Sequence, residues 1–405
     1  MRALQTYLAG VSFSSLAMGI QVVLLPWLAV GVLALDAEQV GWVQASVLLP
    51  SLLLLLVGGA YADGADGGRR LPQMLITLGL VHGLMLWVVF SEWLSLYALL
   101  VYGVMLGICQ AFLQPLRDSM LPRVVKPGDA DDLQRSVIKI SLCYFAFQGL
   151  GIYVAGQQQT LEISVLLLIQ VLGVFLAAFC YSRLPKISPP AESVQDQELG
   201  ERLGSGVRSL MAIPLLRQMI GLVAFNGFMH MGVFIVVIPL LVRDVYGLGA
   251  DYFAGLQLAF VVGNVAANLG LLRRGAVQYP GRSVLFCVFY TGVLLLAIGA
   301  KPTVTGLLLL VFCWGCVTGV ASSLGKSIVQ QLAPAAQRGR VMSIYQLALF
   351  GMAPLGALAC GYAVDYWGGL QVLFASGIIS AVLFVATFML PGLWQLQQAS
   401  LQDNN

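Results

Sequence analysis

The stretch Gly58-Gly59-Ala60-Tyr61-Ala62-Asp63-Gly64-Ala65-Asp66-Gly67-Gly68-Arg69-Arg70 lies between two long apolar runs. The run from Val47 to Val57 leads into it, and another, beginning near Leu75, follows it. Glycines allow helices to approach closely and the chain to turn tightly. Basic residues beside a membrane-length helix are typical of its cytoplasmic end. The stretch therefore predicts a tight cytoplasmic turn between two membrane-spanning helices.

The composition of the whole chain indicates a membrane protein. Of its 405 residues, 59% are hydrophobic and only 10% are charged, whereas soluble globular proteins are about one-quarter charged. Such a chain has too little polar surface to be hydrated on all sides, so most of it must face lipid. All seven cysteines lie in apolar runs, which favours packed thiols over a disulfide framework.

Twelve stretches are long and apolar enough to cross a bilayer, which requires about 20 residues of helix. They are residues 7–33, 39–62, 72–91, 94–116, 135–156, 161–181, 217–241, 250–272, 283–300, 303–325, 341–364 and 369–393. Among the lysines and arginines, only Arg243 and Lys301 fall at the ends opposite the opening stretch. This positive-inside bias and the even number of spans both predict that the two termini are cytoplasmic.

The longest polar stretch lies at the midpoint of the chain and suggests two halves. We predict a six-helix bundle at 1–182, a cytoplasmic linker at 183–212, a second six-helix bundle at 213–395 and a cytoplasmic tail at 396–405. The halves echo each other weakly, as internal repeats of transporters do. The prediction is an all-α membrane protein with twelve transmembrane helices in two pseudo-symmetric six-helix bundles. No Gly-x-x-x-x-Gly-Lys-[Ser/Thr] motif occurs, which disfavours ATP-driven transport by this chain.

The motifs resemble those of the major facilitator superfamily over essentially the whole chain. Gly59 and Asp63 match the Gly-x-x-x-Asp core of the family's loop signature between helices two and three. Asp-x-x-Asp followed by Arg-Arg is similar to the branch with the bacterial enterobactin exporter and related drug exporters. Arg338-Gly339-Arg340-Val341-Met342-Ser343 and Leu121-Pro122-Arg123-Val124-Val125 resemble the same branch. The resemblance implies alternating access by rocking of the two bundles.

Two family signatures are absent or altered. The arginine often found in helix four has no counterpart between Val104 and Ala111. The Gly-Pro pattern of helix five, associated with antiporters, is reduced to Gln148-Gly149-Leu150-Gly151, without proline. Facilitated transport therefore stays open beside proton antiport.

The resemblance implies that the opening stretch is half of a cytoplasmic gate. Asp63 would face the start of helix eleven near Val341, because a helix N-terminus attracts a carboxylate. The alternative is that the glycines and arginines only form a tight turn. The expected gate residues are Gly59, Asp63, Asp66, Arg69, Arg70, Arg338 and Arg340.

Every Asp and Glu lies in a loop or at a helix end, so no carboxylate is available at mid-membrane to carry a proton. Intramembrane ionisable residues are functional candidates by default. His230 lies halfway along the seventh span, and Asn226 lies on the same helix face, four residues earlier. Our hypothesis is that His230 couples protons to transport. The alternative is a neutral histidine that joins helices by hydrogen bonds, and for His82 we expect that structural role.

Amides and aromatic residues within the spans are candidates for the substrate path. Each must find a partner or face a wet cavity, so each is also a candidate for joining helices. Family architecture implies that helices one, four, seven and ten line the path, with two, five, eight and eleven beside them. The expected path residues are Gln21, Gln110, Gln114, Asn226, His230, Gln257, Trp314 and Gln346.

The sequence thus predicts a secondary transporter that exports a small amphipathic molecule, such as a drug or a siderophore. The alternatives are uptake of a nutrient or an iron chelate, and a sensor or assembly protein on a transporter scaffold. We expect no enzyme, because no nucleophile–base pair or metal cluster stands out. The expected partners are the lipid bilayer, a small-molecule substrate and, as a candidate coupling ion, the proton. We expect a monomer in a bacterial inner membrane, with no metal, no cofactor and no nucleic-acid partner.

Overall fold

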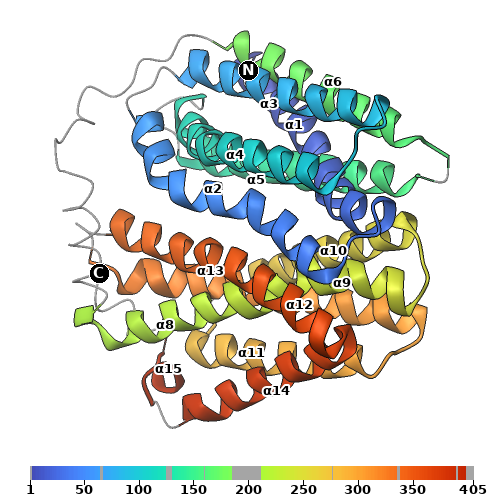
Figure 1. The fold of residues 1–405 in the computed structure, drawn as a ribbon. Helices are drawn as coiled ribbons and strands as arrows, with labels where there is room; N and C mark the ends of the chain where they lie inside the picture. The colour runs from blue at the N-terminus through green and yellow to red at the C-terminus, as the bar shows by residue number, and fades with distance from the viewer. Residues whose placement is uncertain are drawn as a thin grey trace. The chain divides into compact units, whose positions relative to one another are not determined.

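A computed structural model describes residues 2–63, 67–124, 130–158, 160–184, 211–275, 277–334, 338–388 and 391–397, and its regular structure there is entirely helical (Figure 1). The all-helical prediction is confirmed. Residues 185–210 of the predicted linker lie outside the described residues. The elements are α1 (Arg2–Trp27), η1 (Leu28–Val32), α2 (Ala37–Asp63), α3 (Gly67–Phe90), α4 (Leu96–Val124), α5 (Ala130–Gly156), α6 (Ile163–Ser182), α8 (Pro214–Phe225), η2 (Asn226–Met231), η3 (Val233–Val237), α9 (Ile238–Leu240), η4 (Leu241–Val245), α10 (Ala250–Arg274), α11 (Pro280–Gly299), α12 (Val304–Leu332), α13 (Arg338–Trp367), α14 (Gly369–Phe388) and α15 (Pro391–Gln395).

Each of the twelve expected spans overlaps one of these helices or a run of consecutive ones. Within the described residues, ten helices are long and apolar enough to cross a membrane. The expected spans 39–62 and 135–156, which are not among the ten, coincide with α2 and α5. The seventh expected span differs from a regular α-helix. It is a continuous helix whose second half is largely π-helical, from η2 to η4.

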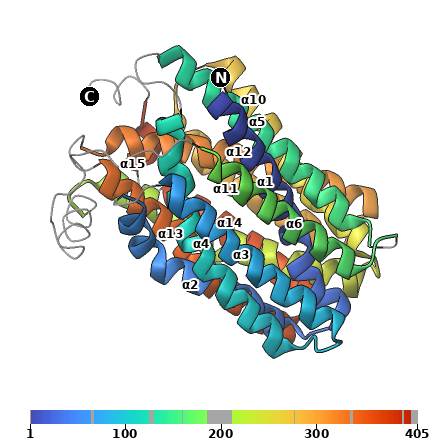
Figure 2. The ribbon, with the colours of Figure 1, turned by 90° about the horizontal axis from the view of Figure 1, so that it is seen from above.

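The first compact unit contains the described residues within 1–35, 42–195 and 248–255. In it, α1 packs on α5 and α6, and α3 packs on α6 and α4. The views in Figures 1 and 2 both show α3 alongside α6. The close contact of α1 with α5 requires glycine at two positions. A Cβ on Gly19 would lie 2.1 Å from the carbonyl oxygen of Gln148, and a Cβ on Gly151 would lie 2.1 Å from the carbonyl oxygen of Leu16. Small residues let the two backbones touch in this way.

The second compact unit contains the described residues within 36–41, 196–247 and 256–405. In it, α11 packs on α14 and α12, while α13 packs along α8, η2 and η3. The same unit includes the first turn of α2, where the Asp365 carboxylate accepts hydrogen bonds from the backbone N–H groups of Ala37 (3.1 Å) and Glu38 (2.8 Å). An acceptor at this position satisfies amides that have no partner within their own helix.

Two short connections show the same backbone pattern in the two units. Glu92, between α3 and α4, and Lys301, between α11 and α12, both have positive φ, 59° and 55°. The amides of Glu92 and Lys301 bond the third carbonyl back along the chain, those of Val89 and Ile298. These connections occupy corresponding places in the two predicted halves, so the repeat extends to the conformation of individual residues.

Candidate functional site

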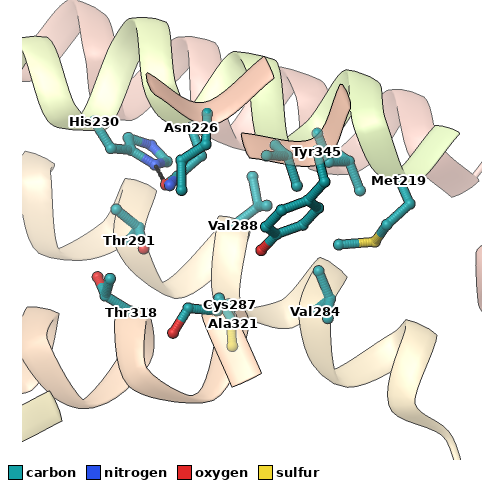
Figure 3. A pocket seen from close by; sticks show the side chains of 14 residues that line it. Met219, Asn226, His230, Val284, Cys287, Val288, Thr291, Thr318, Ala321 and Tyr345 are labelled. Carbon is teal, nitrogen blue, oxygen red and sulfur yellow. Dashed lines mark hydrogen bonds between the residues drawn. The ribbon is translucent and has the colours of Figure 1, made fainter. Parts of the chain in front are cut away.

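A cavity of about 60 Å³ lies inside the second unit, between α8, η2, α11, α12 and α13 (Figure 3). Among the described residues that line it, none is Asp, Glu, Lys or Arg, and several carry a hydroxyl, an amide, a thiol or an imidazole. They are Met219, Leu222, Val223, Asn226, His230, Val284, Cys287, Val288, Thr291, Thr318, Ala321, Ser322, Tyr345 and Leu349. The space holds a few water molecules and is much smaller than the roughly 300–1,000 Å³ of a drug-sized site.

His230 is buried, and both of its ring nitrogens face oxygen atoms. Nδ1 lies 2.9 Å from Oδ1 of Asn226, and Nε2 lies 2.9 Å from Oγ of Ser380. The Ser380 hydroxyl donates its own hydrogen to the carbonyl of Ser376 at 2.8 Å, so Oγ is left to accept. An amide oxygen can only accept. The arrangement therefore offers a hydrogen-bond acceptor to each nitrogen of the ring.

Only the protonated imidazolium has an N–H on both nitrogens. A neutral His230 needs one neighbour to turn: either the Asn226 amide presents its NH₂, or the Ser380 hydroxyl leaves the carbonyl of Ser376. Either turn is a rotation of one side chain. A change in the protonation of His230 would therefore require one local rearrangement. The rings of His230 and Phe225 form a T-shaped pair, with centroids 5.3 Å apart and planes at 84°.

His82 has the opposite surroundings, in the first unit. The Tyr102 hydroxyl lies 2.8 Å from Nδ1 of His82 and donates to Oε1 of Gln21 at 2.9 Å. The hydroxyl oxygen of Tyr102 must therefore accept a hydrogen bond from the Nδ1–H of His82. On the other side of the ring, Nε2 of Gln170 lies 3.4 Å from Nε2 of His82, and it also donates to Oε1 of Gln21. One acceptor and one donor suit a neutral imidazole, as a structural role requires.

Replacing Tyr102 by phenylalanine is expected to destabilise the first unit. The change leaves the buried Nδ1–H of His82 without its acceptor and removes one donor to Gln21, at a cost of about 1–3 kcal/mol. Thermal unfolding of the purified protein in detergent measures the loss. Tyr97→Phe is the matched control, because Tyr97 belongs to the same helix but is 77% exposed. Equal melting temperatures for the two variants would contradict the assignment.

The structure brings only Asn226 and His230, of the expected path residues, to the cavity. Gln346 is half-buried next to Tyr345 of the cavity wall. Gln21 belongs to the His82 network, Gln257 is buried in α10, and Trp314 packs edge-on against Phe234, with ring centroids 5.3 Å apart. The two remaining expected residues lie in α4, where Gln110 is half-buried and Gln114 is exposed.

The expected gate lies mostly outside the described part of the chain. Asp66 and the side chains of Asp63 and Arg338 are not described, and Gly59 is described only as backbone of α2. Arg69 is exposed and Arg340 half-buried. Arg70 donates from Nη1 to the carbonyl of Tyr61 at 3.0 Å and lies over the ring of the same residue, 4.1 Å from its centroid. Arg70 thus ties the start of α3 to the end of α2, and the gate itself stays a prediction.

Several cavity residues were not expected from the sequence. Thr291, Thr318 and Ser322 line it, and Ser380 supplies an acceptor to His230. The signal for Ser380 is its spacing from Ser376, since two hydroxyls four residues apart lie on one face of an otherwise apolar helix. Nothing in the sequence indicates which histidine that face would meet.

Similar proteins agree with this architecture. The chain is 27% identical to the multidrug efflux pump Tap of Mycolicibacterium fortuitum, over 94% of both chains. It is 23% identical to the staphyloferrin A transporter of Staphylococcus aureus, over 85% of both chains. Among solved structures, the nucleoside transporter NupG superposes with a TM-score of 0.73 at 13% identity, over 98% of this chain and 100% of NupG.

The family model described as Major Facilitator Superfamily matches residues 7–357. The match includes most of the first compact unit and the second unit as far as residue 357, within α13. The protein is thus a multi-pass membrane transporter of a small molecule and not an enzyme. The chain belongs to the major facilitator superfamily.

Proposed function

We propose that this protein is a proton-coupled exporter of small amphipathic molecules, with His230 as the group that carries the proton. The observation behind the proposal is the position of the imidazole between two acceptors, in a cavity whose described lining residues include no carboxylate. Burial disfavours a charge and the two acceptors favour it, so the proton can come and go when the cavity opens and closes. The relatives named as an efflux pump and as a siderophore transporter support an amphipathic substrate.

The proposal places the protein in a bacterial inner membrane, as a monomer with both termini cytoplasmic. The charge bias of the loops supports this orientation. The cytoplasmic gate is part of the same proposal, with the residues expected from the sequence: Gly59, Asp63, Asp66, Arg69, Arg70, Arg338 and Arg340. A second candidate function is uptake of an iron chelate, which the similarity to the staphyloferrin A transporter favours.

Transport in membrane vesicles separates the two directions. Everted vesicles with an acidic interior are expected to accumulate a labelled lipophilic drug or siderophore, and a protonophore is expected to abolish the accumulation. Right-side-out vesicles measure uptake of the same labelled compound. Accumulation that is equal with and without the pH gradient would contradict proton coupling. Accumulation only in right-side-out vesicles would show that the protein takes its substrate up and does not export it.

A further inference from the structure

A second cavity in the second unit, of about 270 Å³, lies between α8, α14 and α15. Its α8 wall is a single helical stripe, with residues at spacings of three and four. The lining residues are Gln218, Gly221, Leu222, Phe225, Leu383, Thr387 and Leu393. An engineered apolar cavity of about 150 Å³ accepts benzene, so this one has room for a body of about two fused aromatic rings.

A polar atom beside the cavity lacks a hydrogen-bond partner. Oε1 of Gln218 is buried and has no hydrogen-bond partner among the described residues. The Thr387 hydroxyl does not meet it, because it donates to the carbonyl of Phe384, at 2.6 Å on its own helix. An unpartnered buried acceptor costs free energy until a donor reaches it. Because Oε1 is closed off where it rests against Gly392, the Gln218 amide must turn toward the cavity before an N–H or O–H of an occupant can reach it and remove that cost.

The mouth of the cavity indicates where the occupant comes from. Gly221 is exposed, and a Cβ built on it would meet no atom within 4 Å. Beside Leu383 and Thr387, the outer face of α14 exposes Val382 (62%) and Val385 (64%). In a membrane protein such a face contacts lipid tails, so a molecule at the mouth is dissolved in the bilayer.

The polar end of the cavity lies at the depth where an amphiphile keeps its polar group. Gln218 is only about one turn from the start of α8 at Pro214, and its amide rests against Gly392 of α15, where a Cβ would lie 2.8 Å from Oε1. The neighbouring Arg282 donates from Nε to the carbonyl of Trp394 at 2.6 Å. Tryptophan and arginine at a helix end are typical of the membrane–water interface.

We propose that this cavity binds a bilayer-dissolved compound that has a compact aromatic or alicyclic body and a hydrogen-bond donor. The donor bonds to Oε1 of Gln218. A phospholipid acyl chain is the weaker candidate, because it brings no donor to Oε1. Leu222 lines both cavities, so the occupant lies one side chain away from the cavity of His230. Binding at this site requires neither transport nor a proton gradient. A failure of the binding test would therefore leave the proposed export untouched, and a failure of the export test would leave the binding site untouched.

Equilibrium dialysis of full-length protein in nanodiscs tests the site with two probes. Labelled 2-naphthol has a donor, and 2-methoxynaphthalene has the same body without one; binding to empty nanodiscs is subtracted. The wild type is expected to bind 2-naphthol saturably and about tenfold more tightly than the ether, a difference of one hydrogen bond. Gln218→Leu is expected to abolish that preference while the ether still binds.

Gly221→Leu fills the mouth of the cavity and is expected to abolish binding of both probes. Gly270→Leu is the control, because Gly270 is also an exposed helical glycine with no atom within 4 Å of a built Cβ. Size-exclusion profiles confirm that each variant is folded. Wild-type binding by Gly221→Leu, or no saturable binding at all, would overturn the site. Equal affinity for the two probes in the wild type would overturn the role of Gln218 and favour an acyl chain.

Discussion

Replacing Gly356 by alanine is expected to prevent stable folding of the second unit. A Cβ at this position would lie 1.8 Å from the backbone oxygen of Phe228, and no side-chain movement relieves a clash with backbone. Gly227, on the facing element, has the same constraint, since its Cβ would lie 2.1 Å from the carbonyl of Leu349. The helix α13 and the π-helical segment η2 must separate to admit a methyl group, and the packing lost is expected to cost about 3 kcal/mol or more.

The yield of monodisperse protein and its melting temperature in detergent measure this effect. Gly270→Ala is the matched control, because its Cβ would meet nothing within 4 Å and helix propensity alone favours alanine by about 1 kcal/mol. We expect the control to melt at or slightly above the wild-type temperature. A Gly356→Ala variant that is as stable as the control would show that the two backbones do not touch.

Replacing His230 by alanine is expected to reduce gradient-driven transport by roughly 10- to 100-fold, since hydrogen bonds to a charged group contribute about 1.5–3 kcal/mol. The remaining transport should no longer depend on pH. His82→Gln is the control histidine variant, because His82 lies between a donor and an acceptor, as a neutral ring requires. It is expected to lower stability and to leave the pH dependence in place.

The Asn226→Asp variant gives the sign of the effect. A carboxylate 2.9 Å from the imidazole favours the protonated ring. Release of the proton then requires a higher pH, so the pH profile of transport is expected to shift to the alkaline side, with slower turnover. A profile that stays in place, or shifts to the acid side, would contradict proton transfer at His230.

The sequence predicted the spans because the thickness of a bilayer sets a minimum apolar length that each helix must meet. It also predicted that Asn226 and His230 share a face, since four residues are about one helical turn. It did not predict the π-turns around them. Those turns occur where Gly227 and Gly356 bring two backbones into contact, which is a tertiary property. Ser380, 150 positions along the chain from His230, could be placed only by the packing of α14.

The polar network of the first unit shows the same limit. Gln21, His82 and Gln170 are each visible as polar residues in apolar runs. Gln21 was expected either to line the substrate path or to join helices, and His82 was expected to join helices. Their common partner Tyr102 gave no signal, because a tyrosine near a helix end is ordinary in a membrane protein. Which polar residues meet depends on the rotation of four helices about their axes, and a single sequence does not specify that rotation.

The thiol of Cys287 gives the His230 cavity a chemical reporter of its own. Cys287 is a free cysteine, 7% exposed, and its side chain lines the cavity wall. A space of about 60 Å³ is too small for a maleimide, so alkylation at Cys287 requires the cavity to widen. The rate of its modification therefore measures how often the cavity opens, and a bound substrate that protects the thiol would be detected without a label on the substrate.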